Sequence, residues 1–145
     1  MRDTKTRKAD VLAALERQAD VWLSTADAGV PHIIAVAAWW DGTDLVVATR
    51  GASRTARNLE SNPVARVASG TPADAVVIGA RVVESRPAKD AVEMAKGFAA
   101  AVGWNPGEEE EDWVLFRLRP FRIQAYRGYE EMEGRDVMKG SRWLA

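Results

Sequence analysis

The feature that most limits the fold is a pair of apolar segments separated by a very short polar turn. Residues Pro31–Trp40 form a long apolar stretch without a helix cap, Asp41-Gly42 follows, and Leu45–Thr49 is apolar again. An Asp-Gly turn between two such runs is a strong signal for a β-hairpin. Because the link is too short for the crossover that parallel strands need, the sequence predicts antiparallel pairing.

The rest of the chain predicts more strands, with helices between them. Val11, Leu12 and Leu15 recur at helical spacing, which predicts an N-terminal helix. Helices are expected at 6–19, 53–61 and 89–102. Further strands are expected at Val21–Thr25, Val64–Ala68, Ala75–Glu84, Trp113–Leu118 and Phe121–Tyr126, the last two on either side of Pro120. Six or seven strands with hairpin links predict one mainly β (α+β) domain over residues 1–145, closed as an antiparallel barrel with peripheral helices.

Composition excludes several classes of function. The chain has no cysteine and a single histidine, His32, so thiolate metal sites and cysteine nucleophiles are excluded and histidine-rich metal sites are not expected. The net charge of −1 gives no overall attraction for nucleic acid. The start of the chain is charged, and no apolar run reaches the roughly 20 residues of a membrane span. We therefore expect a cytoplasmic protein without a nucleic-acid or membrane partner.

One segment carries the chemistry of an anion site. After the strand that ends at Thr49, a glycine turn leads to Ser53, which begins a helix, and Arg50, Arg54 and Arg57 fall within eight residues. The N-terminus of a helix favours negative charge, and arginine forms paired hydrogen bonds with phosphate. Two interpretations remain at this point: a phosphate site, or a solvated helix with an ordinary N-cap and scattered surface arginines.

This segment and its continuation to Val67 resemble the strand–Ser-Arg-Lys–helix–Asn-Pro–strand stretch of the pyridoxamine 5'-phosphate oxidases, which holds the phosphate and ribityl chain of FMN. Ser53-Arg54 matches the Ser-Arg pair, Thr49 matches the threonine that ends the preceding strand, and Asn62-Pro63 matches the Asn-Pro. The resemblance covers Val21 to Tyr126 and is closest to a compact, actinobacterial-type branch that uses flavin or deazaflavin. It implies a six- to seven-stranded split β-barrel of the FMN-binding type. The cofactor-binding residues that it implies are Thr49, Arg50, Ser53, Arg54, Thr55 and Arg57.

The chain departs from the family pattern at several charged positions. Thr55 stands where the family has a phosphate-binding lysine, and Ile33–Ala38 lacks the arginine and lysine of the corresponding strand. The C-terminal Arg-Leu-His motif that grips pyridoxamine phosphate is absent. True pyridoxamine 5'-phosphate oxidase activity is therefore not expected. The expected cofactor is coenzyme F-420 or FMN, with haem as an alternative. The spread of the remaining cations, with Arg135 and Arg142 in the tail, favours the longer, multiply anionic F-420.

These observations favour an oxidoreductase that acts on a small organic molecule, with catalytic residues that the sequence does not identify. A barrel of this size is too small to enclose a flavin, so we expect a homodimer with the cofactor between the subunits and with Trp40, Val47 and Tyr126 facing the seam. Two alternatives remain. One is a protein that carries flavin, F-420 or haem without catalysis, and the other is a barrel that serves only as an interaction module.

Four further features have open interpretations. His32 is a cofactor contact, a haem ligand, a proton donor or a polar residue at a strand end. Trp104 either lines the substrate pocket or belongs to a lid packed on the barrel. The acidic run Glu108–Asp112 is expected to be a solvated loop. The N-terminal helix is expected within residues 1–20. The tail, residues 129–145, is expected to pack on the barrel or on a partner subunit. Its apolar residues are Met132, Val137, Met138, Trp143 and Leu144.

Overall fold

The two apolar runs around Asp41 form neighbouring antiparallel strands, as the sequence predicts. β2 (Val30–Trp40) and β3 (Leu45–Arg50) meet at a turn that is held by the side chain of Asp41. Its Oδ1 accepts hydrogen bonds from the backbone N–H groups of Thr43, at 2.9 Å, and Asp44, at 2.7 Å. A carboxylate that binds the backbone two and three residues further on stabilises such a turn. The computed structural model describes residues 1–17 and 20–145.

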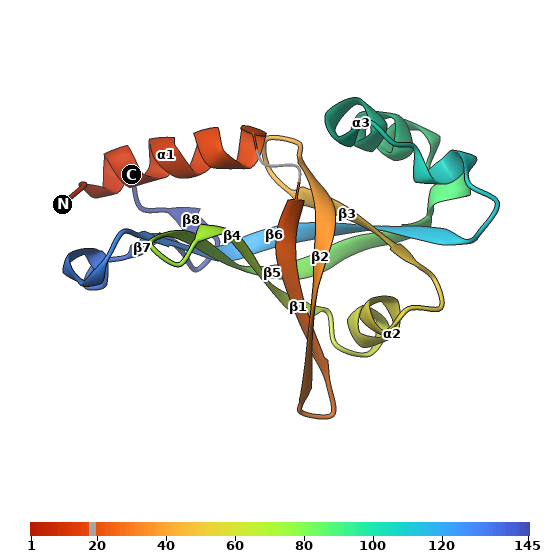
Figure 1. Cartoon of the computed structure of the whole chain (residues 1–145), viewed down its shortest axis with the longest axis horizontal. Helices are drawn as coiled ribbons and strands as arrows, with labels where there is room; N and C mark the ends of the chain where they lie inside the picture. The colour runs from red at the N-terminus through yellow and green to blue at the C-terminus, as the bar shows by residue number, and fades with distance from the viewer. Residues whose placement is uncertain (18–19) are drawn as a thin grey trace.

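Six antiparallel strands close into a barrel in the described part of the chain (Figure 1). The remaining four are β1 (Asp20–Asp27), β4 (Val64–Thr71), β5 (Asp74–Pro87) and β6 (Trp113–Tyr126). The order is β3-β2-β1-β4-β5-β6, and pairing of β3 with β6 closes the ring. Two short strands, β7 (Asp136–Lys139) and β8 (Arg142–Trp143), extend the sheet beyond β6. The predicted mainly β, antiparallel split barrel is confirmed.

Three α-helices surround the barrel in the described residues: α1 (Thr4–Arg17), α2 (Arg54–Ser61) and α3 (Val92–Val102). Figure 1 shows α1 and α3 above the strands and α2 below them. Helix α1 begins at Thr4, two residues before its predicted start, and its predicted end at 18–19 lies outside the described residues. The predicted third helix begins with a separate short turn, η1 (Ala88–Asp90). Two other single turns are η2 (Pro106–Glu108) and η3 (Tyr129–Glu131). No described helix has the length and apolar character of a membrane span.

One predicted element is wrong: the strand pair around Pro120 is a single strand, β6. Arg122 lies opposite Gly79 and Pro120 lies opposite Ala80, so Phe121 is an extra residue on the β6 side. Such a bulge accommodates a residue that cannot donate a hydrogen bond to the ladder. The bulge lets β6 continue past the proline and pair with β5 on one side and with β3 on the other.

The core has two parts that share strand β3. Leu45 and Val47 point into the barrel, whereas Val46 and Ala48 point outward and are covered by α3. This alternation follows from the two-residue period of a strand. The prediction that Trp40 and Val47 face a subunit seam is therefore wrong, because both are buried in the barrel core, Val47 completely.

A glycine sets the distance between α3 and the barrel. A Cβ atom at Gly97 would collide with the indole of Trp39 on β2. The missing side chain lets the helix approach the strand closely, which is the usual reason for glycine inside a helix despite its cost in stability. The helix then buries Met94 and Phe98 against the outer side of the sheet.

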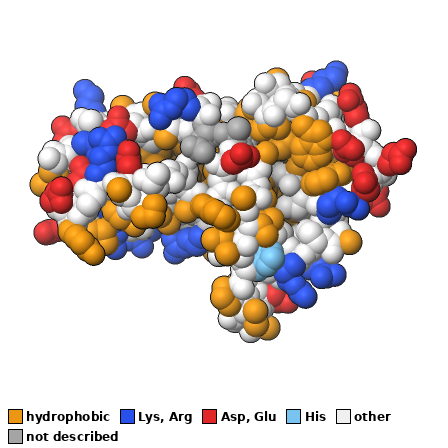
Figure 2. Space-filling model, in the orientation of Figure 1, with side chains coloured by type: hydrophobic (Ala, Val, Ile, Leu, Met, Phe, Trp, Pro, Cys, Tyr) orange, Lys and Arg blue, Asp and Glu red, His pale blue; other side chains and the backbone are white. Residues whose placement is uncertain are grey.

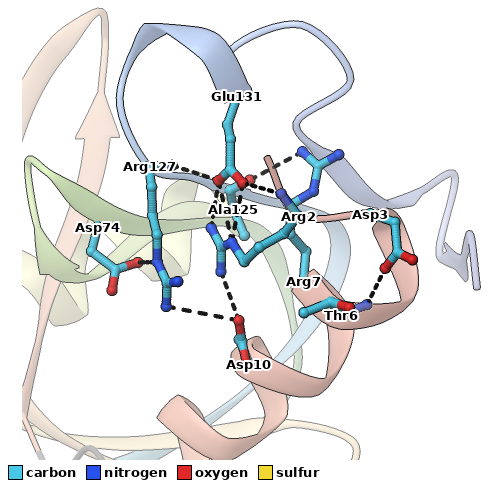
Figure 3. A network of polar contacts seen from close by, with 9 residues as sticks. All are labelled: Arg2, Asp3, Thr6, Arg7, Asp10, Asp74, Ala125, Arg127 and Glu131. Atoms are coloured by element: carbon cyan, nitrogen blue, oxygen red, sulfur yellow. Dashed lines mark hydrogen bonds and ion pairs between the residues drawn. The ribbon is translucent and has the colours of Figure 1, made fainter.

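A network of ion pairs ties the start of the chain to its tail (Figure 3). Arg2 donates to Glu131 at 2.7 Å through both its backbone N–H and Nη2, and donates to Asp10 at 3.0 Å. Arg127 donates its backbone N–H to Glu131 at 2.8 Å and pairs with Asp74 at 3.1 Å. Glu131 is only 3% exposed. A buried carboxylate is tolerated here because several donors surround it.

The tail packs on the barrel of its own chain. Val137 and Met138 are buried in the core, and Trp143 lies against it with Lys8 above its ring at 5.0 Å. Leu144 was expected to pack as well, but it is 52% exposed because it follows the last strand pair. In Figure 1 the tail lies at the opposite end of the barrel from α2.

We expect Glu131→Gln to lower the free energy of unfolding at pH 7 by about 2 kcal/mol, because it removes the buried carboxylate that pairs with the half-buried Arg2 and leaves only Asp10 as its partner. The hydrogen bond from Arg2 lowers the pKa of Glu131 from 4.5 to about 2, although burial opposes the shift. Because the folded state has the lower pKa, the ionised carboxylate stabilises the protein above pH 4.5. That contribution is lost as the pH falls from 4.5 towards 2.

Urea unfolding at pH 7 and at pH 3 measures this contribution. The wild-type protein should lose more stability between the two pH values than the variant. Glu130→Gln is the matched control, because Glu130 is exposed beside the same turn. Equal pH dependence in all three proteins would contradict the assignment.

Candidate functional site

The barrel is split where β2 and β3 separate. These strands pair only next to their turn, from Ala38–Val47 to Trp40–Leu45. Beyond Ala38 towards Val30, β2 is paired only with β1, while β3 continues along β6 as far as Arg50. The edge of β2 that faces β3 is thus left without a strand partner in the described structure. Unpaired backbone N–H and C=O groups on such an edge are available to a ligand.

A hollow of about 330 Å³, here called the central hollow, lies in this opening. One side is the apolar stretch Ile34–Ala37 of β2, and the other is the end of β3 with Thr49 and Arg50. Ser53, Trp104 and Trp113 also line it. The hollow is therefore apolar along the strand and polar where β3 leads into α2.

Helix α2 begins at this polar end. Ser53 is its N-cap, and its Oγ accepts a hydrogen bond from the backbone N–H of Ala56 at 3.1 Å. The backbone N–H groups of Arg54 and Thr55 have no acceptor within the helix, as is general for a first turn. The hydroxyl of Ser53 still has its proton to donate. These donors, with the positive end of the helix dipole, favour an anion at this point.

Hydrogen bonds to β1 fix the position of α2. Asn58 Nδ2 donates to Thr25 Oγ1 at 3.1 Å, and both side chains are buried. Ser61 Oγ donates to Asp27 at 3.1 Å, and Asn62 Nδ2 donates to the carbonyl of Ala26 at 3.3 Å. The helix is held across the strand end, so its N-terminus stays directed at the split.

A second hollow of about 360 Å³, the hairpin hollow, lies on the other side of the α2 N-terminus. It is lined by Asp27, Ala28, Val30, Pro31, His32, Arg54 and Asn58. His32 lines the hairpin hollow, and Ile34, two positions further along the same face of β2, lines the central hollow. Arg54 and Ser53, which are consecutive, also line one hollow each, so the two hollows adjoin. Figure 2 shows the histidine, in pale blue, next to blue basic side chains. His32 is therefore a half-exposed residue in a polar hollow beside an arginine.

The structure separates the sequence-predicted site residues into three groups. Thr49, Arg50 and Ser53 line the central hollow, and Arg54 lines the hairpin hollow. Thr55 is buried, with 1% exposure. Arg57 is exposed on α2 and lines neither of these two hollows.

Buried polar atoms without partners test whether the site fits an anionic cofactor. In the described structure the hydroxyl of Thr49 and the Oδ1 of Asn58 are shielded from water and have no hydrogen-bond partner. Thr49 lines the central hollow and Asn58 lines the hairpin hollow. Unpaired buried polar groups are costly, and a ligand is one way to satisfy them. The Thr49 hydroxyl, with Arg50, Ser53 and Arg54, can donate hydrogen bonds to an anionic group, whereas Asn58 Oδ1 can only accept one.

Sequence reasoning missed one residue of the site, Trp113. Its ring packs edge-to-face on Trp104 with 4.7 Å between centroids, and the guanidinium of Arg50 lies 5.7 Å from its centroid. The two tryptophans are nine positions apart in the sequence, and the intervening loop has no regular spacing. The only signal was an aromatic residue at the first position of a strand directly after an acidic run.

A further polar hollow, under α1, is structural. It has a volume of about 310 Å³ and lies next to Arg2, Asp10, Asp74 and Arg127. Those charges already pair with one another in the network of Figure 3. Among the described residues, no group of three or more Asp, Glu or His side chains is arranged to hold a metal ion.

Comparison with known proteins defines the class. The family model described as pyridoxamine 5'-phosphate oxidase matches residues 8–127, which include all six barrel strands and α2. The chain belongs to this family. No curated protein sequence matches it.

Solved structures give the same fold. An F-420 reductase superposes with a TM-score of 0.65 at 21% identity, over 77% of this chain and 93% of the reductase. The general stress protein 26 of Bacillus anthracis gives 0.65 at 21% identity, over 81% and 92% of the two chains. A pyridoxamine 5'-phosphate oxidase-related, FMN-binding protein of Nostoc punctiforme gives 0.62 at 15% identity, over 88% and 87%. At these identities the likeness is one of fold.

We expect Ser53→Ala to lower the free energy of unfolding by about 1 kcal/mol, because the first turn of α2 loses its cap. Ser53→Asp should stay within roughly 0.5 kcal/mol of the wild-type protein, since aspartate caps a helix as well as serine does and suits the helix dipole. Urea unfolding measures both variants. Equal losses would contradict a capping role for this side chain.

Proposed function

We propose that this protein is a flavin- or deazaflavin-dependent oxidoreductase that acts on a small organic molecule. The observation that carries the proposal is the opening between β2 and β3, where an apolar wall and the N-terminus of α2 face one hollow. Arg50, Ser53 and Arg54 would hold the anionic tail of the cofactor. The cofactor supplies hydride chemistry, and the protein supplies orientation and electrostatics. This division explains why the hollow needs no acid–base pair of its own.

Coenzyme F-420 fits the site better than FMN. The compact phosphate of FMN calls for several cations at one point, but Thr55 replaces a lysine and Ile33–Ala38 carries no charge. The cations that remain are distributed, with Arg50 on the central hollow and Arg54 on the hairpin hollow. The adjoining hollows offer a path for a long tail with spread negative charge. The fold is shared with an F-420 reductase and with an FMN-binding protein alike, so the choice rests on the distribution of cations.

We expect Arg54→Ala to weaken cofactor binding by about 1.5 kcal/mol, or about tenfold, near the lower limit for a hydrogen bond to a charged group because Arg54 is exposed. Arg57→Ala is the matched control on the same helix. Ser53→Asp should abolish binding while the fold persists, because it places a carboxylate in the anion site. Titration of each variant with F-420 and with FMN, in one buffer, gives the dissociation constants.

Two outcomes of this titration would contradict the proposal. Equal effects of the two arginine substitutions would remove Arg54 from the site, and tighter binding of FMN would reverse the choice of cofactor. Anaerobic mixing of the reduced cofactor with candidate acceptors then separates the two functions. An oxidoreductase reoxidises its cofactor in many turnovers, whereas a carrier binds it without turnover.

A second copy of the chain would complete the site. Trp22 and Ile33, on the outer face of β1 and β2, are 53% and 60% exposed. Ala35 lies opposite Trp22 in the sheet and also lines the central hollow. The exposed apolar strip is therefore continuous with the open side of that hollow. Burial of such a strip is a common basis for a symmetric dimer.

We expect Trp22→Glu to convert a dimer into a monomer and to weaken cofactor binding, because a charge would be placed in the apolar seam. Tyr129→Glu is the control, since Tyr129 is also an exposed aromatic residue but lies on η3. Light scattering gives the molar mass of each protein. A monomeric wild-type protein with cofactor bound would contradict the dimer.

A further inference from the structure

Two indole rings form an aromatic corner of the central hollow. Trp104 follows α3 and Trp113 begins β6, and their planes meet at 78°. Trp104 also contacts Phe98 of α3 edge-on at 6.0 Å between centroids, and its Nε1 donates to Glu109 Oε1 at 2.6 Å. These contacts fix the orientation of the ring. Both tryptophans stay half-buried and line the hollow, so part of the corner faces open space.

The lining of the hollow has properties that packing alone does not explain. The Nε1 of Trp113 is shielded from water and has no acceptor among the described residues. Thr49, one position away in the ladder that pairs β3 with β6, is 4% exposed and its hydroxyl is also unpaired. A rigid aromatic corner beside unpaired polar groups is typical of a small-molecule site.

Both acidic and basic residues lie close to this hollow. The chain between the two tryptophans contains the uninterrupted acidic run Glu108–Asp112, and Glu108, Glu110, Glu111 and Asp112 are exposed. Arg54 lies on α2, whereas Arg50 lies opposite Trp113 in the ladder, with its guanidinium 5.7 Å from the centroid of that ring. Figure 2 shows a hydrophobic patch with acidic side chains beyond it and basic side chains below it. Exposed acidic side chains next to a cleft raise the local concentration of cations.

We propose that Trp104, Trp113 and the loop Glu108–Asp112 form a substrate subsite for a planar, conjugated cation. This inference rests on the proposed function, in which the anionic tail of the cofactor occupies the arginine side. The face of an indole attracts cations, and a flat conjugated ring matches its apolar surface. An anionic molecule of the same shape would be repelled by the loop.

The charge of the substrate also suits hydride transfer. A bound cation that accepts a hydride forms one new bond to hydrogen and becomes neutral. Its two electrons come with the hydride from the reduced flavin or deazaflavin, which is thereby oxidised. The neutral product is no longer attracted by the acidic loop, so it leaves more readily than the substrate.

The test uses two planar tricyclic dyes of opposite charge, methylene blue as the cation and resorufin as the anion. Equilibrium dialysis against the full chain gives their dissociation constants at low and at high salt. We expect methylene blue to bind at least tenfold more tightly than resorufin at low salt. Added salt should reduce the preference, because charges at the rim are screened.

Three variants locate the subsite. Glu110→Lys with Glu111→Lys should abolish the preference for the cation. Glu130→Lys with Glu133→Lys makes the same change in net charge on exposed residues outside the hollow and should leave the preference intact. Trp104→Leu should weaken methylene blue binding about tenfold. Equal affinity for both dyes, or equal effects of the two double variants, would overturn the proposal.

Cofactor titration of the same proteins separates this proposal from the proposed function. If the cofactor binds and neither dye is preferred, the subsite is wrong and the oxidoreductase remains. If the dyes behave as expected and neither cofactor binds, the cation subsite remains and the proposed function is wrong.

Discussion

The site exists because β2 and β3 pair with each other only next to their turn. Their ladder ends at Ala38–Val47, beyond which β2 is paired with β1 alone, while β3 is paired with β6 along its whole length. The resulting gap exposes a strand edge inside the molecule rather than at its periphery. Helix α2 closes the lower end of the gap, because Asn58 and Thr25 hold it against β1. The opening, its apolar wall and the position of the α2 N-terminus thus all follow from the separation of β2 from β3.

A second core, outside the barrel, supports the other wall. Residues on the outer side of β3 and β6 pack under α3, and Gly97 lets that helix approach Trp39. Phe98 on the same helix contacts Trp104, which contacts Trp113, which lies under Arg50. This chain of contacts links a hydrophobic cluster to a charged residue of the candidate cofactor site. The aromatic corner is consequently as rigid as the helix that supports it.

The sequence predicted those features of the fold that depend on residues close together in the chain. The Asp41 turn, the Ser53 cap and the strand that ends at Thr49 could be assigned because turn and cap chemistry acts over three or four positions. The continuity of β6 could not, since it depends on a bulge opposite Gly79 that only pairing with β5 reveals. The burial of Val47 and the contact between Trp104 and Trp113 likewise depend on long-range packing. The grouping of Thr49, Arg50 and Ser53 around one hollow follows from local sequence, but the hollow itself does not.

Closure of the barrel by β3 and β6 has a consequence for how the protein is made. The two strands are separated by more than sixty residues, so β3 must wait for its partner while β4, β5 and α3 leave the ribosome. A sheet of the first five strands alone is open and has two unpaired edges, the apolar strand Leu45–Arg50 and β5. Contacts of such high sequence separation form slowly, and exposed strand edges promote aggregation. The nascent chain therefore passes its most vulnerable stage just before Trp113–Tyr126 emerges, and synthesis of that one strand ends it.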